Sequence, residues 1–311
     1  MQTIMSNGLR ISRMTLGTVQ LGLPYGVANR TGKPDERQSA EMLEAALAGG
    51  VNCFDTAQMY GDSELILGRC FAHREPPVLV SKIVLELEKE ENAASVERKV
   101  LAALERSLER LRLRRIPIML LHWPHVLLRH GSLVTAAFER AVRAGYADQV
   151  GVSLPATDAL GFAELWPTLR HEVYGAVQIA ANLFDQRLLG EPLELLRQAG
   201  KTVFVRSLFL QGLLLMEPDR LPPHLEEAAP YLRQLARLAE REGCAPAELA
   251  VGYVRDRPGV HSLVIGADNT SQVEANIRLV ETPPLREETA ATVARLFADV
   301  PDYLISPHLW K

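Results

Sequence analysis

Residues 52–68 read NCFDTAQMYGDSELILG, and this stretch contains the pattern from which the fold is predicted. A short apolar run ends in Asp55, a polar loop carries Tyr60, and an amphipathic helical pattern follows. A strand followed by a helix is the repeating unit of α/β proteins. In barrels built from this unit, the C-terminal ends of the strands form the active site, which directs attention to Asp55 and Tyr60.

The same alternation of short apolar runs and longer amphipathic stretches continues almost to the end of the chain. The strands that it predicts span residues 14–19, 51–56, 77–83, 116–122, 149–154, 175–180, 202–207 and 262–267. No change of composition and no Ser/Gly-rich linker divides them. The pattern therefore predicts one (β/α)8 barrel domain over residues 1–311, with an open doubly wound sheet as the main alternative.

Helical patterns fill the gaps between the predicted strands. The clearest covers residues 95–112, where apolar residues recur three and four apart and arginines gather near the C-terminal end. We also expect a small hairpin under the barrel from residues 2–13. Helical patterns at 224–243 and 245–259, and another after the last strand, predict helices beyond the eight plain units.

Composition excludes several classes of protein. The chain has 311 residues, of which 47% are hydrophobic, a net charge of -4 and a pI of about 6.1. It therefore lacks the broad basic field that nucleic-acid binding needs. Cys53, Cys70 and Cys244 are odd in number and have no C-x-x-C spacing, which predicts reduced thiols and no structural zinc. No stretch approaches the roughly 18 apolar residues of a membrane span, so we expect a cytoplasmic protein.

Four polar residues lie at or just after three consecutive predicted strands: Asp55, Tyr60, Lys82 and His122. Each by itself has a structural explanation, respectively a helix cap, a rim aromatic, a solvated strand end and a hydrogen-bonded core histidine. Together they favour a functional interpretation. A lysine at the end of an apolar strand needs a carboxylate nearby, and Asp55 ends the adjacent strand.

The chemistry of these four groups points to proton transfer. An ammonium beside a phenol favours the phenolate, so Lys82 would help Tyr60 release its proton to a developing alkoxide. Asp55 would keep Lys82 charged and oriented, and His122 would fix the substrate oxygen by a hydrogen bond. Such a set protonates a carbonyl oxygen while another group attacks the carbon. Because none of the four supplies the attacking group, we predict a hydride-carrying cofactor.

The segments FDTAQMYG (54–61), VSKI (80–83) and LLHWP (120–124) resemble the signature regions of the aldo-keto reductases. The resemblance extends from LGTVQLG (16–22) to QVEANI (272–277). It implies a (β/α)8 barrel that reduces aldehydes and ketones with NAD(P)H. By the same resemblance, Asp55, Tyr60, Lys82 and His122 are the catalytic residues.

The resemblance also implies a cofactor site. Ser153 and Gln178 would hold the nicotinamide carboxamide, and the backbone from 207 to 212 would hold the pyrophosphate. The implied cofactor-binding residues are Gly17, Thr18, Asp55, Ser153, Gln178, Arg206, Ser207, Leu208, Phe209, Gln211, Gly212, Gly266, Gln272 and Asn276.

This sequence departs from the family pattern at several of these positions. Leu154 replaces an asparagine, Arg206 replaces an aromatic residue that stacks on the nicotinamide, and Gly266 and Gln272 stand where basic residues often bind the 2'-phosphate. A guanidinium plane can also stack on the ring, but it adds positive charge there. The expectation is NADP(H) in preference to NAD(H), with no metal.

The substrate is expected to be a small carbonyl compound, with a sugar or sugar conjugate as one candidate. Tyr60, His122 and Trp123 would form its pocket. A second hypothesis is a nicotinamide-cofactor-binding redox sensor or regulatory subunit with slow turnover. A third is a metal-dependent barrel hydrolase that uses His122 and His125. Nothing in the sequence indicates an oligomeric state.

Overall fold

The computed structural model describes residues 1–26, 32–155 and 159–310, and eight of its strands form a closed parallel barrel. Around the ring the order is β10, β3, β4, β5, β6, β7, β8 and β9. The strands span Met14–Gly17 (β3), Cys53–Asp55 (β4), Val78–Ile83 (β5), Ile116–Leu121 (β6), Ala147–Ser153 (β7), Tyr174–Ala180 (β8), Thr202–Arg206 (β9) and Ser262–Gly266 (β10). Each overlaps a predicted strand. The (β/α)8 barrel is confirmed, and the open doubly wound sheet is excluded.

The predicted N-terminal hairpin is present and closes the N-terminal end of the barrel. Its strands, Thr3–Ser6 (β1) and Leu9–Ser12 (β2), pair antiparallel. Asn7 and Gly8 connect them with φ angles of 47° and 82°, the left-handed conformation that tight hairpin turns require. The Asn7 side chain donates to the carbonyl oxygens of Gly175 at 3.0 Å and Gly200 at 3.2 Å, at the starts of β8 and β9.

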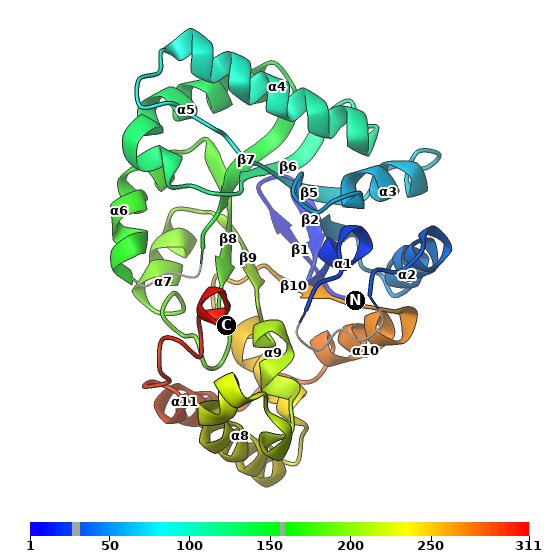
Figure 1. Cartoon of the computed structure of the whole chain (residues 1–311), viewed down its shortest axis with the longest axis vertical. Helices are drawn as coiled ribbons and strands as arrows, with labels where there is room; N and C mark the ends of the chain where they lie inside the picture. Colours follow the sequence, from blue (N-terminus) through cyan, green and yellow to red (C-terminus); the bar gives the residue numbers. More distant parts are fainter. Residues whose placement is uncertain (27–31, 156–158, 311) are drawn as a thin grey trace.

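Helices surround the strands (Figure 1). They span Val19–Gly22 (α1), Glu36–Ala48 (α2), Ser63–Cys70 (α3), Ala93–Leu111 (α4), Val126–Arg143 (α5), Ala159–Leu169 (α6), Glu191–Gln198 (α7), Ala229–Glu242 (α8), Pro246–Arg255 (α9), Thr270–Val280 (α10) and Glu287–Leu296 (α11), with short 3-10 turns at Leu210–Leu215 (η1), Pro218–Arg220 (η2), Pro223–Ala228 (η3) and Pro307–Leu309 (η4). The extra helices before β10, namely α8 and α9, and after it, α10 and α11, are confirmed. None of the helices in the described part of the chain is both long enough and apolar enough to cross a membrane.

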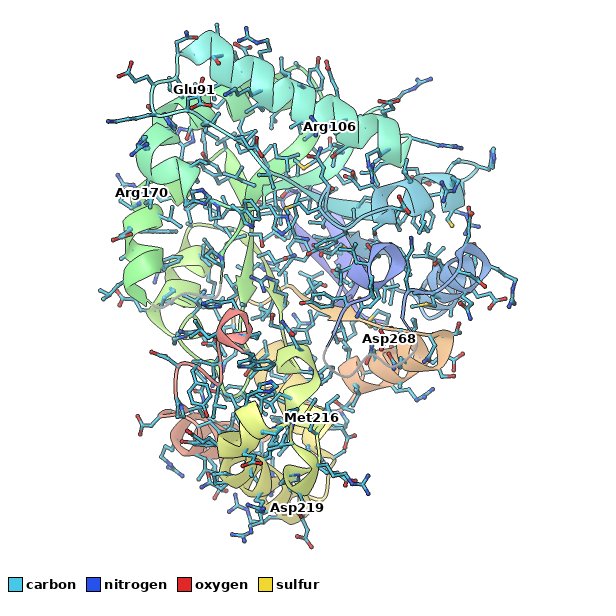
Figure 2. All side chains as sticks on the ribbon, viewed as in Figure 1. Glu91, Arg106, Arg170, Met216, Asp219 and Asp268 are labelled. Atoms are coloured by element: carbon cyan, nitrogen blue, oxygen red, sulfur yellow. The ribbon has the colours of Figure 1, made fainter. Side chains whose placement is uncertain are left out.

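Helix α4 shows how the sequence specifies an outer helix. The side chain of Asn92 caps its N-terminus by accepting from the backbone N–H of Ser95 at 2.9 Å, and Arg112 ends it in the left-handed conformation. Val96, Val100 and other apolar residues at helical spacing face the barrel and are buried. Exposed charged residues such as Arg106 lie on the opposite, outer side (Figure 2).

The barrel interior determines where the polar residues go. An apolar cluster lies inside the barrel on the N-terminal side of the polar residues. It consists of Ile11, Cys53, Val80, Ile118, Leu120, Ala176 and Phe204. Successive side chains of a strand point to opposite faces, so the residue two positions later points inward again. On five strands, or just past their ends, a polar residue follows an inner apolar residue by two positions. These polar residues are Asp55, Lys82, His122, Gln178 and Arg206. These five polar side chains therefore converge at the C-terminal mouth.

Candidate active site

Lys82 and Asp55 form an ion pair inside the barrel mouth. The Nζ atom of Lys82 donates to Asp55 Oδ1 and Oδ2 at 2.7 and 2.6 Å, and to the carbonyl oxygen of Thr56 at 2.9 Å. Gln178 Nε2 donates to Asp55 Oδ1 at 2.7 Å. The side chains of the pair are buried, with relative exposures of 1% for Lys82 and 4% for Asp55. These hydrogen bonds fix the position of the Lys82 ammonium group.

Tyr60 lies beside this ammonium, in the loop between β4 and α3. Lys82 Nζ is 4.9 Å from the centroid of the Tyr60 ring. The His122 ring meets the Tyr60 ring edge-on, with centroids 5.8 Å apart and an interplanar angle of 84°. The structure thus brings together the four residues that the sequence singled out, from the ends of β4, β5 and β6.

His122 is neutral in this environment. Burial, and then the cations of Lys82 and Arg206, lower the pKa of His122 from 6.5 to about 3. Its Nδ1 atom is buried and has no hydrogen-bond partner among the described residues. A neutral imidazole carries one N–H donor, so His122 is suited to donate a hydrogen bond to a substrate oxygen.

A cavity of about 590 Å³ opens at the C-terminal ends of the strands. It touches fifteen of the predicted site residues: Gly17, Thr18, Asp55, Tyr60, His122, Ser153, Arg206, Ser207, Leu208, Phe209, Gln211, Gly212, Gly266, Gln272 and Asn276. Three predicted residues are not among its lining. Lys82 and Gln178 lie behind Asp55, and Trp123 is 46% exposed beside His122, with ring centroids 6.1 Å apart. The pocket role of Trp123 stays a prediction.

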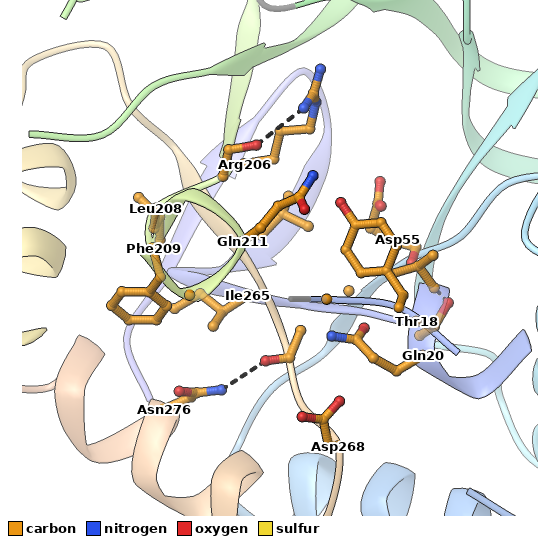
Figure 3. A pocket seen from close by; sticks show the side chains of 18 of the residues that line it. Thr18, Gln20, Asp55, Arg206, Leu208, Phe209, Gln211, Ile265, Asp268 and Asn276 are labelled. Carbon is orange, nitrogen blue, oxygen red and sulfur yellow. Dashed lines mark hydrogen bonds between the residues drawn. The ribbon is translucent and has the colours of Figure 1, made fainter. Parts of the chain in front are cut away.

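Arg206 is anchored at the end of the cavity beside His122. Its Nη2 donates to the carbonyl oxygen of Leu154 at 2.9 Å, and its Nη1 donates to Ser207 Oγ at 3.1 Å (Figure 3). Leu154, which replaces the family asparagine, thus contributes its backbone rather than its side chain. Ser153 Oγ donates to Gln178 Oε1 at 3.4 Å, which links β7 to the Asp55 cluster.

The backbone just after β9 forms a tight turn with several residues in the left-handed conformation. Ser207, Leu210 and Gln211 have φ angles of 66°, 48° and 55°, and Gly212 has 100°. Left-handed backbone at three non-glycine residues costs energy and concentrates at functional sites. Backbone turns of this kind form concavities that bind anions. Asn182 stabilises the turn by donating to the carbonyl oxygen of Ser207 at 3.1 Å.

The cavity also contains residues that the sequence analysis missed: Val19, Gln20, Tyr25, Gly26, Leu215, Val264, Ile265 and Asp268. Gln20 stands three residues after the end of β3, and Asp268 stands two residues after the end of β10. Inspection of every segment after a strand end would therefore have found both residues. Tyr25 is a second phenol in the cavity. Burial, and then the proximity of Tyr60, raise the pKa of Tyr25.

The described residues offer no metal-binding group in support of the hydrolase hypothesis. Within residues 1–26, 32–155 and 159–310, no three or more His, Cys, Asp or Glu side chains are grouped so that they could hold a metal ion. The three cysteines are free thiols.

A (β/α)8 barrel with a buried lysine–carboxylate pair beside a phenol, at a cavity on the C-terminal side of the strands, has the arrangement of a barrel enzyme that transfers a proton. Comparison with known proteins agrees. The model of the Aldo/keto reductase family matches residues 13–297. The chain belongs to the aldo/keto reductase family and is an oxidoreductase.

Two curated relatives illustrate the range of the family. The aldo-keto reductase YhdN of Bacillus subtilis (strain 168) is 26% identical over 296 residues, covering 88% of this chain and 86% of YhdN. A Schizosaccharomyces pombe (strain 972 / ATCC 24843) protein, whose name assigns it provisionally as a voltage-gated potassium channel subunit beta, is 26% identical over 306 residues. That match also covers 88% of this chain and 86% of the relative.

Solved structures share the fold. The aldo-keto reductase AKR11C1 from Bacillus halodurans, in its holo form, superposes with a TM-score of 0.76 at 23% identity, covering 98% of this chain and 99% of that one. An aldo/keto reductase from Klebsiella pneumoniae in complex with NADP and acetate gives a TM-score of 0.69 at 24% identity, covering 96% and 95%.

Proposed function

We propose that this protein reduces an aldehyde or ketone to an alcohol with a nicotinamide dinucleotide, and that Tyr60 is the proton donor. One observation supports this role above the others: the Lys82 ammonium lies 4.9 Å from the Tyr60 ring centroid while it is ion-paired with Asp55. A fixed cation at this place stabilises the negative charge that develops on the phenol oxygen when Tyr60 gives up its proton.

The residues of the cavity fit a dinucleotide. The tightly coiled backbone after β9 suits the pyrophosphate. Ser153 would contact the carboxamide. Gln178 accepts a hydrogen bond from Ser153 and donates one to Asp55, so it would orient these two side chains. Gln20 Oε1 is a buried acceptor in the cavity wall that has no partner among the described residues, as expected of a ligand contact. NADP(H) rather than NAD(H) was expected from the sequence, and the NADP of the Klebsiella structure is consistent with that expectation.

The bound cofactor would supply the hydride. Neutral His122 would donate its N–H to the carbonyl oxygen and so orient the carbonyl beside Tyr60. Tyr60 would then transfer its hydroxyl proton to that oxygen, and Lys82 would stabilise the resulting phenolate. Solvent would return the proton to Tyr60 before the next turnover.

The substrate is proposed to be a small carbonyl compound, with a sugar or sugar conjugate as the favoured candidate. Two aromatic side chains near the catalytic end remain open to solvent: Tyr25, which is 43% exposed, and Trp123, which is 46% exposed. Apolar ring faces with a polar tip suit a ligand that has both C–H faces and hydroxyl groups. An activity screen of small aldehydes, ketoses and aldoses tests this assignment.

The regulatory-subunit hypothesis is the second candidate, since one curated relative carries the name of a channel subunit. Both functions need a cofactor site, so only the rate of the chemical step separates them. Stopped-flow oxidation of the bound, reduced cofactor against a panel of aldehydes measures this rate. Fast oxidation with a substrate supports the reductase, and slow oxidation with every aldehyde supports the sensor.

The role of Tyr60 is tested by Tyr60→Phe, which removes only the hydroxyl group. We expect cofactor affinity, measured by fluorescence titration, to stay within about twofold, and kcat to fall at least about 100-fold, the usual contribution of general acid catalysis. Tyr146→Phe is a matched control, because its hydroxyl bonds Glu105 at 3.3 Å on the surface, away from the cavity. Full turnover by Tyr60→Phe would exclude Tyr60 as the proton donor.

We also propose that residues 1–311 act as one domain, because the N-terminal hairpin closes the barrel and Leu304 and Ile305, near the C-terminus, are buried in its core. The cytoplasmic location stays a prediction.

A further inference from the structure

The loop that carries Tyr60 begins at the barrel strands and is fixed there by backbone hydrogen bonds. The N–H of Thr56 donates to the carbonyl oxygen of Val80 at 2.8 Å. The N–H of Gln58 donates to the carbonyl oxygen of Lys82 at 3.0 Å. Both acceptors belong to β5, so the part of the loop before Tyr60 has a fixed position relative to the strand that carries Lys82.

The part of the loop after Tyr60 is held by helix α4, which lies outside the barrel. The Arg110 Nη2 atom donates to the carbonyl oxygen of Gly61, the residue next to Tyr60. The same guanidinium donates from Nε to Glu64 Oε2 at 2.9 Å. A planar guanidinium can hold two acceptors at once in a fixed geometry, whereas a lysine ammonium is a single charge on a flexible stem. Arg110 thus ties both the loop and helix α3 to helix α4.

Glu64 continues this connection back to strand β5. Its side chain has a relative exposure of 0%, compared with 25% for Arg110. The Ser81 hydroxyl group donates to Glu64 Oε1 at 2.6 Å, so each carboxylate oxygen has a partner. Ser81 and Lys82 are neighbours on β5, and successive side chains of a strand point to opposite faces. Lys82 therefore points into the barrel, while Ser81 points outward to Glu64.

Two connections therefore link the strand of Lys82 to the loop of Tyr60. One is the backbone before Tyr60, and the other passes through Glu64 and Arg110 to the backbone after it. Because Tyr60 is held on both sides, Lys82 Nζ stays 4.9 Å from the centroid of the Tyr60 ring. In the proposed reaction this distance matters, because the ammonium stabilises the charge that develops on the phenol oxygen.

Helix α4 contacts the loop at a second place. Gln58 Nε2 donates to the carbonyl oxygen of Ala103 at 2.7 Å and to Ser107 Oγ at 2.9 Å. Ala103, Ser107 and Arg110 are four and three residues apart, so they share one face of the helix. Helices α3 and α4 lie side by side with little room between them (Figure 1). A Cβ atom on Gly68 of α3 would lie 2.2 Å from the carbonyl oxygen of Arg110.

We propose that Arg110 is a positioning residue that holds Tyr60 beside Lys82 during the reduction. It does so by donating to the Gly61 carbonyl oxygen and to the buried carboxylate of Glu64. Arg110 is not among the described residues that line the cavity, so it acts through the loop and not on the substrate. The inference rests on the proposed function, because it requires Tyr60 to be the proton donor.

Arg110→Lys tests the proposal, because it keeps a positive charge for Glu64 and removes the planar fork. We expect kcat to fall about 10- to 100-fold, because a small displacement of a catalytic group is costly. The KM of the carbonyl substrate and the dissociation constant of the reduced cofactor, read from its fluorescence, should stay within about twofold. The solvent deuterium isotope effect on kcat should increase, because proton transfer from a displaced Tyr60 becomes slower. Arg106→Lys is the matched control, since Arg106 is exposed on the outer side of the same helix (Figure 2).

A second variant, Arg110→Gln/Glu64→Gln, is made in case Arg110→Lys does not fold. It removes both charges, so no buried carboxylate is left without its cation. Circular dichroism and urea unfolding check that the double variant is folded, and we expect the same fall in kcat. Failure of both variants to fold would assign Arg110 to stability alone and overturn the proposal.

The outcomes separate this inference from the proposed function. A folded variant with the kcat of wild type overturns the positioning role of Arg110 and leaves the proposed function intact. A fall in kcat with an equal loss of cofactor affinity, or with an unchanged isotope effect, also overturns it, because that result indicates a general distortion of the site. Full turnover by Tyr60→Phe, or no turnover by wild type with any aldehyde, overturns the proposed function and the inference with it.

Discussion

The Lys82 ammonium lies 4.9 Å from the centroid of the Tyr60 ring while it donates to both carboxylate oxygens of Asp55. One buried cation thus interacts with two groups. It pairs with the Asp55 carboxylate in the resting enzyme, and it would stabilise the Tyr60 phenol oxygen during the proposed proton transfer. This relationship connects stability with catalysis, because removing the cation affects both.

Lys82→Met should destabilise the protein as well as inactivate it, because Asp55 would be left buried without its cation. We expect the free energy of unfolding, measured in urea, to fall by about 3 to 5 kcal/mol. The double variant Asp55→Asn/Lys82→Met removes both charges and should recover most of that stability, while turnover stays lost. A single variant as stable as wild type would show that the pair contributes nothing to folding.

His122 should make the folded state sensitive to acid. The pKa of His122 is about 3 in the folded protein and near 6.5 in the unfolded chain. Between these values the unfolded chain binds a proton that the folded protein does not, so stability falls as the pH drops below 6.5. From about pH 7.5 to about pH 5, wild type should lose about 1 to 2 kcal/mol more than His122→Gln.

Urea unfolding of both proteins at the two pH values measures this difference. Equal losses in wild type and His122→Gln would show that His122 takes up a proton in the folded state near its ordinary pKa.

Arg206→Gln should change the balance between oxidised and reduced cofactor. The oxidised nicotinamide ring is a cation and the reduced ring is neutral, so a guanidinium at the catalytic end favours the reduced form. We expect wild type to bind the reduced cofactor several-fold more tightly than the oxidised one, and Arg206→Gln to narrow that ratio. Calorimetric titration with both forms is the measurement. The same ratio in both proteins would place Arg206 away from the ring.

Gly22→Ala should displace the loop that carries Tyr60. A Cβ atom on Gly22 would lie 1.7 Å from the carbonyl oxygen of Tyr60 and 2.7 Å from its carbonyl carbon. Backbone at such a distance must move, and a shift of about 1 Å in a catalytic group can cost about 100-fold in rate. Gly190→Ala is the control, since a Cβ atom there meets nothing within 4 Å. Equal kcat values for the two variants would contradict the expectation.

The eight strands were predictable because each is a short apolar run bounded by polar segments, a local property of the sequence. The convergence of Asp55, Lys82 and His122 was also predictable, because each follows an inner apolar residue by two positions and side chains alternate along a strand. Trp123 shows the limit of this reasoning. As the next residue after His122 it points elsewhere, and it lies exposed rather than in the lining of the cavity.

Residues in the segments that follow the strands were harder to predict. Gln20 lies in the short helix α1 and Asp268 in the loop after β10, far apart in the sequence. The direction of such a side chain depends on which neighbours it packs against. The place of the Gln20 amide depends on Gly266, and the path of the Tyr60 loop depends on its close contact with Gly22. Neither contact has a periodic signal in the sequence.

The amino-acid sequence by itself determined the succession of strands and helices and the four polar groups at the strand ends, because these follow from local hydrophobic periodicity. It also determined the family resemblance, which rests on the short motifs around those four residues. Only the tertiary structure decided which charge lies at which end of the cavity. That outcome depends on closing the barrel, which brings β10 beside β3 and so places Asp268 and Gln20 on one wall, far from Arg206.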